Sequence, residues 1–198
     1  MNGTQYDPEV KINIKNLYLA EVTRSKGELV FSTPELVLGL MELSREPKIS
    51  GGDIYGDGKI RRQVKKRVGT QFTLRHNGLP SRWRQYIEGL KLSADGVESD
   101  PDDVNPGEFA MGYTIEKTNG EKELVWVLDC VAEPAKATFS QSEDKITWST
   151  DSYDLLAMYV PGLERSYTSV DLALEQNKTV TEEQFFAKVQ ISDKVVAV

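Results

Sequence analysis

The sequence predicts a mainly β protein: an antiparallel β-sandwich or barrel with one flanking α-helix and a possible C-terminal helix. Three observations lead there. Short segments that alternate apolar and polar side chains recur along the chain, clusters of Gly, Pro, Asn and Asp separate them, and only residues 80–89 carry a firm helical stripe. About eight to ten such strands bury their apolar faces best against one another.

The first strand is expected from Lys11, because apolar side chains recur at alternate positions on one face, namely at Ile12, Ile14, Tyr18, Ala20 and Val22. Residues 1–9 are polar, and we expect a flexible N-terminal arm there. Ser25-Lys26-Gly27 predicts a turn, residues 28–32 a second strand, and residues 33–43 a loop followed by a strand.

The chemically unusual stretch begins near residue 46. A strand is expected at Lys48–Ser50, and residues 50–58 are expected to form a projecting loop that carries Ile54 and Tyr55 outward between glycines. The next strand is strongly basic: six of its nine residues are cationic, namely Lys59, Arg61, Arg62, Lys65, Lys66 and Arg67. A strand charged on both faces cannot lie in a core.

The helix expected at 80–89 follows a strand at 71–76. It carries an i, i+4, i+7 stripe of Trp83, Ile87 and Leu90, with Gly89 as its C-terminal cap. Residues 91–107 are rich in Asp, Pro and Gly and are expected to form an acidic surface loop.

A hairpin is predicted next, because Asn119-Gly120 is the preferred pair for a two-residue turn. We expect Trp126, Leu128 and Cys130 on one face of its second strand and Val125 and Val127 on the other. Further strands are expected at 145–150 and 155–160. Thr181 with Gln184 predicts a capped C-terminal helix.

Composition narrows the function classes. The chain has 198 residues, which suits one β-domain at 10–192 with a short tail at 193–198. A formal net charge of -7 argues against a dedicated reader of duplex DNA, since nonspecific affinity comes mostly from phosphate neutralisation. One cysteine allows no intrachain disulfide, and neither a signal peptide nor a membrane-spanning run is visible. We expect no membrane association.

No catalytic, cofactor-binding or metal-binding motif is present. A Cys/His dyad would have to use His76 and Cys130, for which structural roles are expected. Asp53 and Asp57 do not have the spacing of a calcium loop. Carboxylates for hydrolysis could come only from loop residues, Asp100, Asp102 and Asp103, where solvation is the better explanation.

Three interpretations of the basic strand remain open. It can be a solvated face, a seam between identical subunits, or a nucleic-acid contact, although it lacks the aromatic residues of a stacking platform. The acidic stretch Asp95–Glu108 is one candidate complement for a seam. The residues expected at contacts between subunits or rings are Ile54, Tyr55, Arg61, Arg62 and Lys65.

In their order and spacing, several segments resemble the major tail protein, or tail tube protein, family of long-tailed bacteriophages with non-contractile tails. The segments that carry the resemblance are KINIKNLYLAEVT from Lys11, EPKISGGDIYGDG from Glu46, the strand from Gly69 to Leu74, Leu79-Pro80 with its helix, Phe109–Tyr113, Lys145–Thr150 and Glu183–Val189.

The resemblance implies a sandwich-like subunit with a flanking helix. Six copies would form a ring, and stacked rings would form a tube through which DNA passes without specific binding during genome ejection. Tape measure and tail completion or baseplate proteins are the implied partners. The implied location is the virion tail, after synthesis in the host bacterial cytoplasm.

Two other function classes compete. A carbohydrate- or ligand-binding β-sandwich module would use Trp83, Trp126 and Trp148 for stacking, although their patterns favour the core. A nucleic-acid-binding protein would use the basic strand. An enzyme is the last alternative, because the polar constellations it needs are missing.

Overall fold

The computed structural model describes residues 10–56, 59–133, 136–137, 150–160, 162–163 and 165–191. Strands dominate them: β1 Lys11–Ser25, β2 Glu28–Phe31, β3 Glu35–Val37, β4 Leu40–Gly56, β5 Lys59–His76, β6 Lys91–Leu92, β7 Glu98–Ser99, β8 Phe109–Lys117, β9 Lys122–Ala132, β10 Lys136–Ala137, β11 Asp151–Ala157 and β12 Tyr167–Asp171. The helices are α1 Ser81–Glu88, the 3-10 turn η1 Glu175–Asn177 and α2 Glu182–Phe186.

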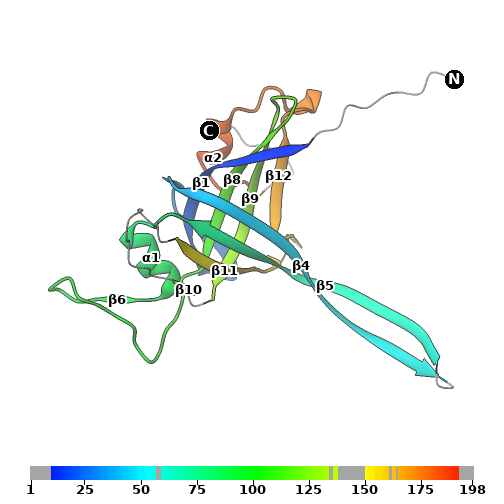
Figure 1. The fold of residues 1–198 in the computed structure, drawn as a ribbon, viewed down its shortest axis with the longest axis horizontal. Coiled ribbons are helices and arrows are strands. Elements are labelled where there is room, and N and C mark those ends of the chain that lie inside the picture. Colours follow the sequence, from blue (N-terminus) through cyan, green and yellow to red (C-terminus); the bar gives the residue numbers. More distant parts are fainter. Residues whose placement is uncertain are drawn as a thin grey trace, which may run out of the picture.

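One antiparallel sheet in the order β2-β1-β8-β9-β11-β5-β4 forms the body, with β3 on β1, β12 on β9 and β10 on β11. The sheet curls so that β4 and β5 cross in front of β8 and β9 (Figure 1). The predicted antiparallel, mainly β architecture is confirmed. A separate pair, β6 with β7, lies beyond α1.

The first core lies inside the curl. It joins Phe72 and Leu74 of β5 to Met111 and Tyr113 of β8, and Trp83 on α1 closes it from the side. As predicted, Trp83 and Ile87 form the buried stripe of α1, and Gly89 ends the helix in the left-handed conformation (φ 71°).

The second core covers the opposite face of β1, β8 and β9. Phe185 and Phe186 of α2 pack there against Trp126, and the Tyr18 ring stacks on Phe186 at 4.2 Å between ring centroids. The helix begins with the predicted capping box, in which Thr181 and Gln184 bond each other's backbone N–H groups.

Two bulges overturn the expected sharing of strand faces. In β1 the register shifts between Lys15 and Tyr18, where Asn16 has a positive φ of 56°, so Ile14 packs on the first core and Tyr18 on the second. In β9 the register shifts after Val127, so Cys130 faces the first core while Trp126 faces the second. Each extra residue reverses the alternation of side chains beyond it.

Other segments also differ from expectation. Residues 50–56, expected as part of a loop, continue β4, because each finds a cross-strand partner in β5. The strand expected at 155–160 runs instead from Asp151 to Ala157. The acidic segment 91–107 contains the short β6–β7 pair. The strand expected at 145–150 and the segments 1–9 and 193–198 lie outside the described residues.

Candidate intermolecular interface

A long hairpin leaves the body of the molecule. Residues 70–76 of β5 pair with both β4 and β11, whereas residues 59–69 pair with β4 alone among the described strands. We call the outer part, residues 48–56 of β4 with residues 59–69 of β5, the arm. It extends well away from the body (Figure 1). Both of its edges therefore present backbone groups without a strand partner in the part of the chain described.

Two features at the base of the arm explain why the hairpin separates from the body there. Lys48 pairs with Gly69 and Ile49 with Arg67, so Val68 is an extra residue in β5, just beyond the last contact with β11. Such a bulge bends the strand and increases its twist. Pro47 in β4 lacks a backbone donor, which suits an edge strand.

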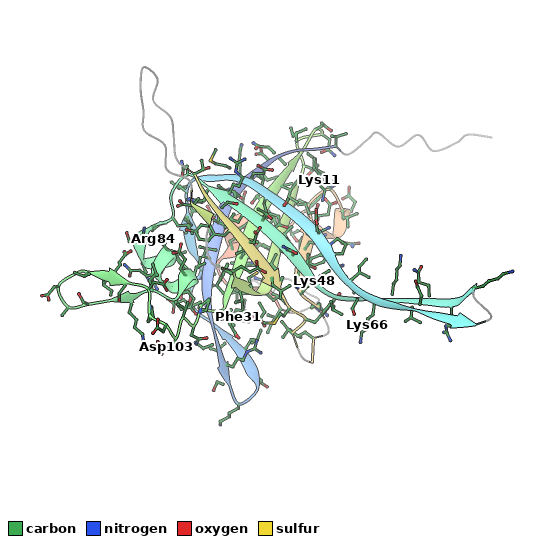
Figure 2. All side chains as sticks on the ribbon, turned by 60° about the horizontal axis from the view of Figure 1, so that its bottom comes forward. Lys11, Phe31, Lys48, Lys66, Arg84 and Asp103 are labelled. Atoms are coloured by element: carbon green, nitrogen blue, oxygen red, sulfur yellow. The ribbon has the colours of Figure 1, made fainter. Side chains whose placement is uncertain are left out.

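Cations lie on both faces of the arm. Register places Arg62 and Lys66 with Val64 on one face, and Lys65 and Arg67 on the other. All five side chains are exposed, and Figure 2 shows Lys66 on the arm, outside the body. The facing part of β4 has glycines at positions 51 and 52. A Cβ on Gly51 would come within 2.6 Å of the Val64 carbonyl oxygen, so this close strand pairing needs glycine.

The described cations of the arm have no carboxylate partner among the described residues, whereas many cations of the body do. Ion pairs among the described residues lie on the body, as between Arg24 and Asp129 or Lys122 and Glu182. Arg62, Lys65 and Lys66 make none within the described structure. Arg67 donates only to the Gly69 carbonyl and to the Thr70 hydroxyl. The arm thus carries a concentrated positive charge that the described fold does not neutralise.

The residues predicted at contacts all belong to the arm. Ile54 pairs with Arg62 and Tyr55 with Ile60, which makes Arg61 an extra, bulged residue between them. The structure therefore brings Ile54, Tyr55, Arg61 and Arg62 together near the tip, with Lys65 farther toward the body. The side chains of Ile54, Tyr55 and Arg61 lie outside the described part. The bulge at Arg61 carries no signal in the sequence.

Acidic side chains gather at the other end of the molecule. The β6–β7 lobe, residues 91–103, contains Asp95, Asp100 and Asp102, none of which has an ion pair among the described residues, whereas Asp103 pairs with Lys91. Figure 2 shows Asp103 on this lobe and Lys66 on the arm, on opposite sides of the body. Within one copy, the cationic and anionic ends therefore cannot meet.

The two residues of a hypothetical Cys/His dyad are not brought together. Strand β11 pairs with His76 through Asp151 and with Cys130 through Ala157, which separates them by about 20 Å of strand. Burial raises the pKa of the Cys130 thiol and lowers that of His76, whose Nδ1 accepts a hydrogen bond from the Gly78 N–H. In both cases burial disfavours the charged form of the group.

Two of the three tryptophans proposed for sugar stacking, Trp83 and Trp126, are not available at the surface. Trp126 and Trp83 are buried, with Trp126 Nε1 donating to the Phe185 carbonyl and Trp83 Nε1 to Glu35. Trp148 lies outside the described residues.

Asp53 is exposed on the arm, and the described residues hold no group of three acidic, histidine or cysteine side chains suited to a metal ion.

No helix in the described part of the chain is long and apolar enough to span a membrane. The sequence matches no family model and no curated protein.

Several solved structures superpose partly on the backbone of this chain. A six-fold symmetrised cryo-EM structure of the anti-feeding prophage baseplate aligns at a TM-score of 0.45 and 7% identity, covering 86% of this chain and all of the matched chain. Hcp1 from Salmonella typhimurium aligns at 0.33 and 10%, covering 81% and 93% of the two chains. Another Hcp protein aligns at 0.31 and 12%, covering 79% and 99%. Similarities this distant establish no function for this chain.

Proposed function

We propose that this protein is a structural virion protein that assembles with itself into stacked hexameric rings and so forms a phage tail tube, a conduit for DNA during genome ejection. The observation that carries the proposal is the arm: a projecting two-stranded ribbon with open edges and unneutralised cations. The family resemblance in the sequence supplies the ring of six, the stacking and the passage of DNA.

An arm of this kind is unfavourable in a protein that stays monomeric. Two-stranded ribbons are marginally stable in water, and open strand edges invite pairing with other chains. Soluble monomers shorten or cover such edges. The length of the arm and its mutually repelling cations therefore favour a partner that pairs with its backbone and neutralises its charge.

The placement of charge favours another copy as that partner. Complementary patches at opposite ends of one chain produce a head-to-tail contact, which closes into a ring or continues as a filament. The arm and the β6–β7 lobe are such a pair. Their opposite charges would set partner choice and register more than raw affinity.

The overall charge suits a conduit for DNA. A wall that bound phosphate tightly would retard the passage of DNA, and a net charge of -7 opposes such binding. We accordingly assign the arm cations to contacts between subunits or rings and not to the lumen. Tape measure and tail completion or baseplate proteins would meet the ends of the tube, and the assembled protein would reside in the virion tail.

Charge reversal on the arm tests the proposal. We expect Arg62→Glu with Lys65→Glu to abolish tubes in negative-stain electron microscopy and ring-sized species in size-exclusion chromatography, while circular dichroism and the melting temperature stay unchanged. The control, Lys26→Glu with Lys178→Glu, changes the net charge equally at exposed sites on the body and should leave assembly intact. Normal tubes from the arm variant would contradict this role of the arm.

Nucleic-acid binding is the second candidate, favoured by the same unpaired cations, since a two-stranded ribbon can enter the major groove of duplex DNA. It predicts binding that weakens steeply with salt and is lost in the arm variant. We expect no retention of duplex or single-stranded DNA at physiological salt. Tight, salt-sensitive binding by a protein that forms no tubes would favour this candidate instead.

A further inference from the structure

A second open site lies on the body, away from the arm. A groove of about 460 Å³ runs between the start of β1 and the start of β4, with Tyr113 and Val125 from β8 and β9 among its lining residues. On its two sides stand Ile12 and Met41, which are 61% and 51% exposed. We call this the β1–β4 groove. Apolar side chains this exposed suit a protein contact, and Lys11, Glu42, Arg45 and Glu123 add charges to the lining.

The groove is bordered by two strand edges that have no strand partner in the described part of the chain. Strand β3 covers residues 17–19 of β1 and β2 covers residues 22–25, so among the described strands residues 11–16 pair only with β8. Residues 40–47 of β4 likewise pair only with β5 in the described structure. The curled sheet is therefore open here, and an extended segment could hydrogen-bond to these edges as an added strand.

The sequence holds a segment with the chemistry of such a strand. Residues 195–198 read Val-Val-Ala-Val, and β-branched residues favour extended backbone. An uncharged run of this kind is also prone to aggregation when nothing covers it. Residues 1–9, before the first described residue, are mostly polar and contain no comparable apolar run.

The position of the last described residues favours a neighbour's groove over the chain's own. Residues 187–191 follow α2, whose Phe185 and Phe186 pack on the second core, whereas the groove residues Ile14 and Leu43 pack on the first. The two cores lie on opposite faces of β1, β8 and β9. A tail reaching its own groove would have to pass around a sheet edge within seven residues, about 24 Å at full extension.

We propose that residues 192–198 of one copy bind in the β1–β4 groove of a second copy as an added strand. The last described residues follow α2 on one face of the sheet and the groove lies on the other, so such a contact would be head-to-tail and could be repeated from copy to copy. This extends the proposed self-assembly by naming a second contact between copies, independent of the arm.

Cysteine cross-linking between two full-length variants tests the proposal. One carries Ile12→Cys at the groove and the other carries Val196→Cys; the native Cys130 is fully buried and does not interfere. After mild oxidation of the mixture, we expect a disulfide-linked heterodimer on a non-reducing gel, because a disulfide needs the two Cα atoms within about 7 Å. A synthetic peptide of residues 190–198 should reduce the yield several-fold, and a peptide with Val195→Asp and Val196→Asp should not.

The matched control replaces Ile12→Cys with Val30→Cys, a site on β2 that is also about half exposed (49%, against 61% for Ile12). Equal cross-linking to both sites, or none to the groove, would overturn the proposal. A double variant that closes the disulfide within one chain at high dilution would also overturn it, since the tail would then fill its own groove. Electron microscopy of the same samples separates the two ideas: tubes without cross-links refute only the groove contact, and cross-links without tubes refute only the tail tube.

Discussion

The buried carboxylate of Asp129 offers the sharpest test of how the body is held together. It sits at the bulge of β9 with its side chain 1% exposed, and its Oδ2 accepts a hydrogen bond from Arg24 of β1 at 2.7 Å. Its Oδ1 has no hydrogen-bond partner among the described residues. Arg24→Ala would therefore strand a buried negative charge that the fold cannot otherwise satisfy.

The expected loss follows from this asymmetry. Removing one partner of a fully buried pair costs about 3–5 kcal/mol. Arg24 is 41% exposed, so water can partly replace it, and we expect about 2–3 kcal/mol. Arg24→Ala with Asp129→Asn should recover part of this loss because the uncompensated charge is gone. For a chain of this size the single variant should melt about 4–12 °C lower.

Urea unfolding followed by tryptophan fluorescence measures the effect, with an unchanged m-value as the check on two-state behaviour. The matched control is Arg75→Ala, which breaks an exposed pair with Glu42 and should cost about 0–1 kcal/mol. Burial already raises the pKa of Asp129, and losing Arg24 raises it further. The deficit of Arg24→Ala should therefore narrow as the pH falls from 7 toward 4, where the folded state gains the proton first.

The reasoning fails if Arg24→Ala is no more destabilised than Arg75→Ala. It also fails if the deficit grows on acidification, because then the stranded carboxylate is not its cause.

Three further predictions concern α2 and β5. Phe186→Ala should lower the free energy of unfolding by about 3–5 kcal/mol, since the ring is buried and stacked on Tyr18; a loss below about 1 kcal/mol in urea unfolding would show that α2 does not brace the sheet. Glu182→Gln should cost about 1–3 kcal/mol at pH 7, where the carboxylate accepts from Lys122. Burial alone would raise the pKa of Glu182, but the hydrogen bonds from Lys122, Thr114 and Asn16 hold it below 4.5. The difference in stability between Glu182→Gln and wild type should therefore vanish as the pH falls through that lowered pKa, and a difference that stays constant would contradict the assignment. The wild type should lose stability as the pH falls below 6.5, because burial lowers the pKa of His76, and urea midpoints of His76→Leu should show a weaker loss than wild type over that range.

Local patterns predicted the elements well wherever one face of a segment meets the core. The capping box at Thr181 and the stripe of Trp83 and Ile87 are read from a few neighbouring residues, and the structure has both. The hairpin at Asn119-Gly120 is also present, but its turn is not the expected two-residue one: Lys117 bonds to Glu121 across three residues, and only Gly120 has a positive φ. The failures are at bulges. Asn16 and the residues after Val127 reverse the faces of β1 and β9, and such a reversal depends on the neighbouring strand, which the local sequence does not contain.

The candidate interface was predicted in part for the same reason. The basic run at 59–67 is visible as a local excess of charge, and its exposure follows from that charge. The Gly- and Asp-rich residues 50–56 suggested a loop, yet they continue a strand because β5 supplies their hydrogen bonds. The β1–β4 groove has no local signal at all, since it arises from the gap between two strands some thirty residues apart in sequence.

By itself, the sequence determined the class of fold, the helices with their caps and the presence of a cationic strand in an acidic chain, because each depends on side chains within a few residues of one another. Only the tertiary structure decided that this strand projects as an arm, that Arg62, Lys65 and Lys66 have no carboxylate partner in the described structure while many cations of the body do, and that acidic and basic regions lie on opposite sides of the body. Those properties depend on which distant strands meet and which edges stay open, and hydrogen bonds between strands, not local preference, settle them.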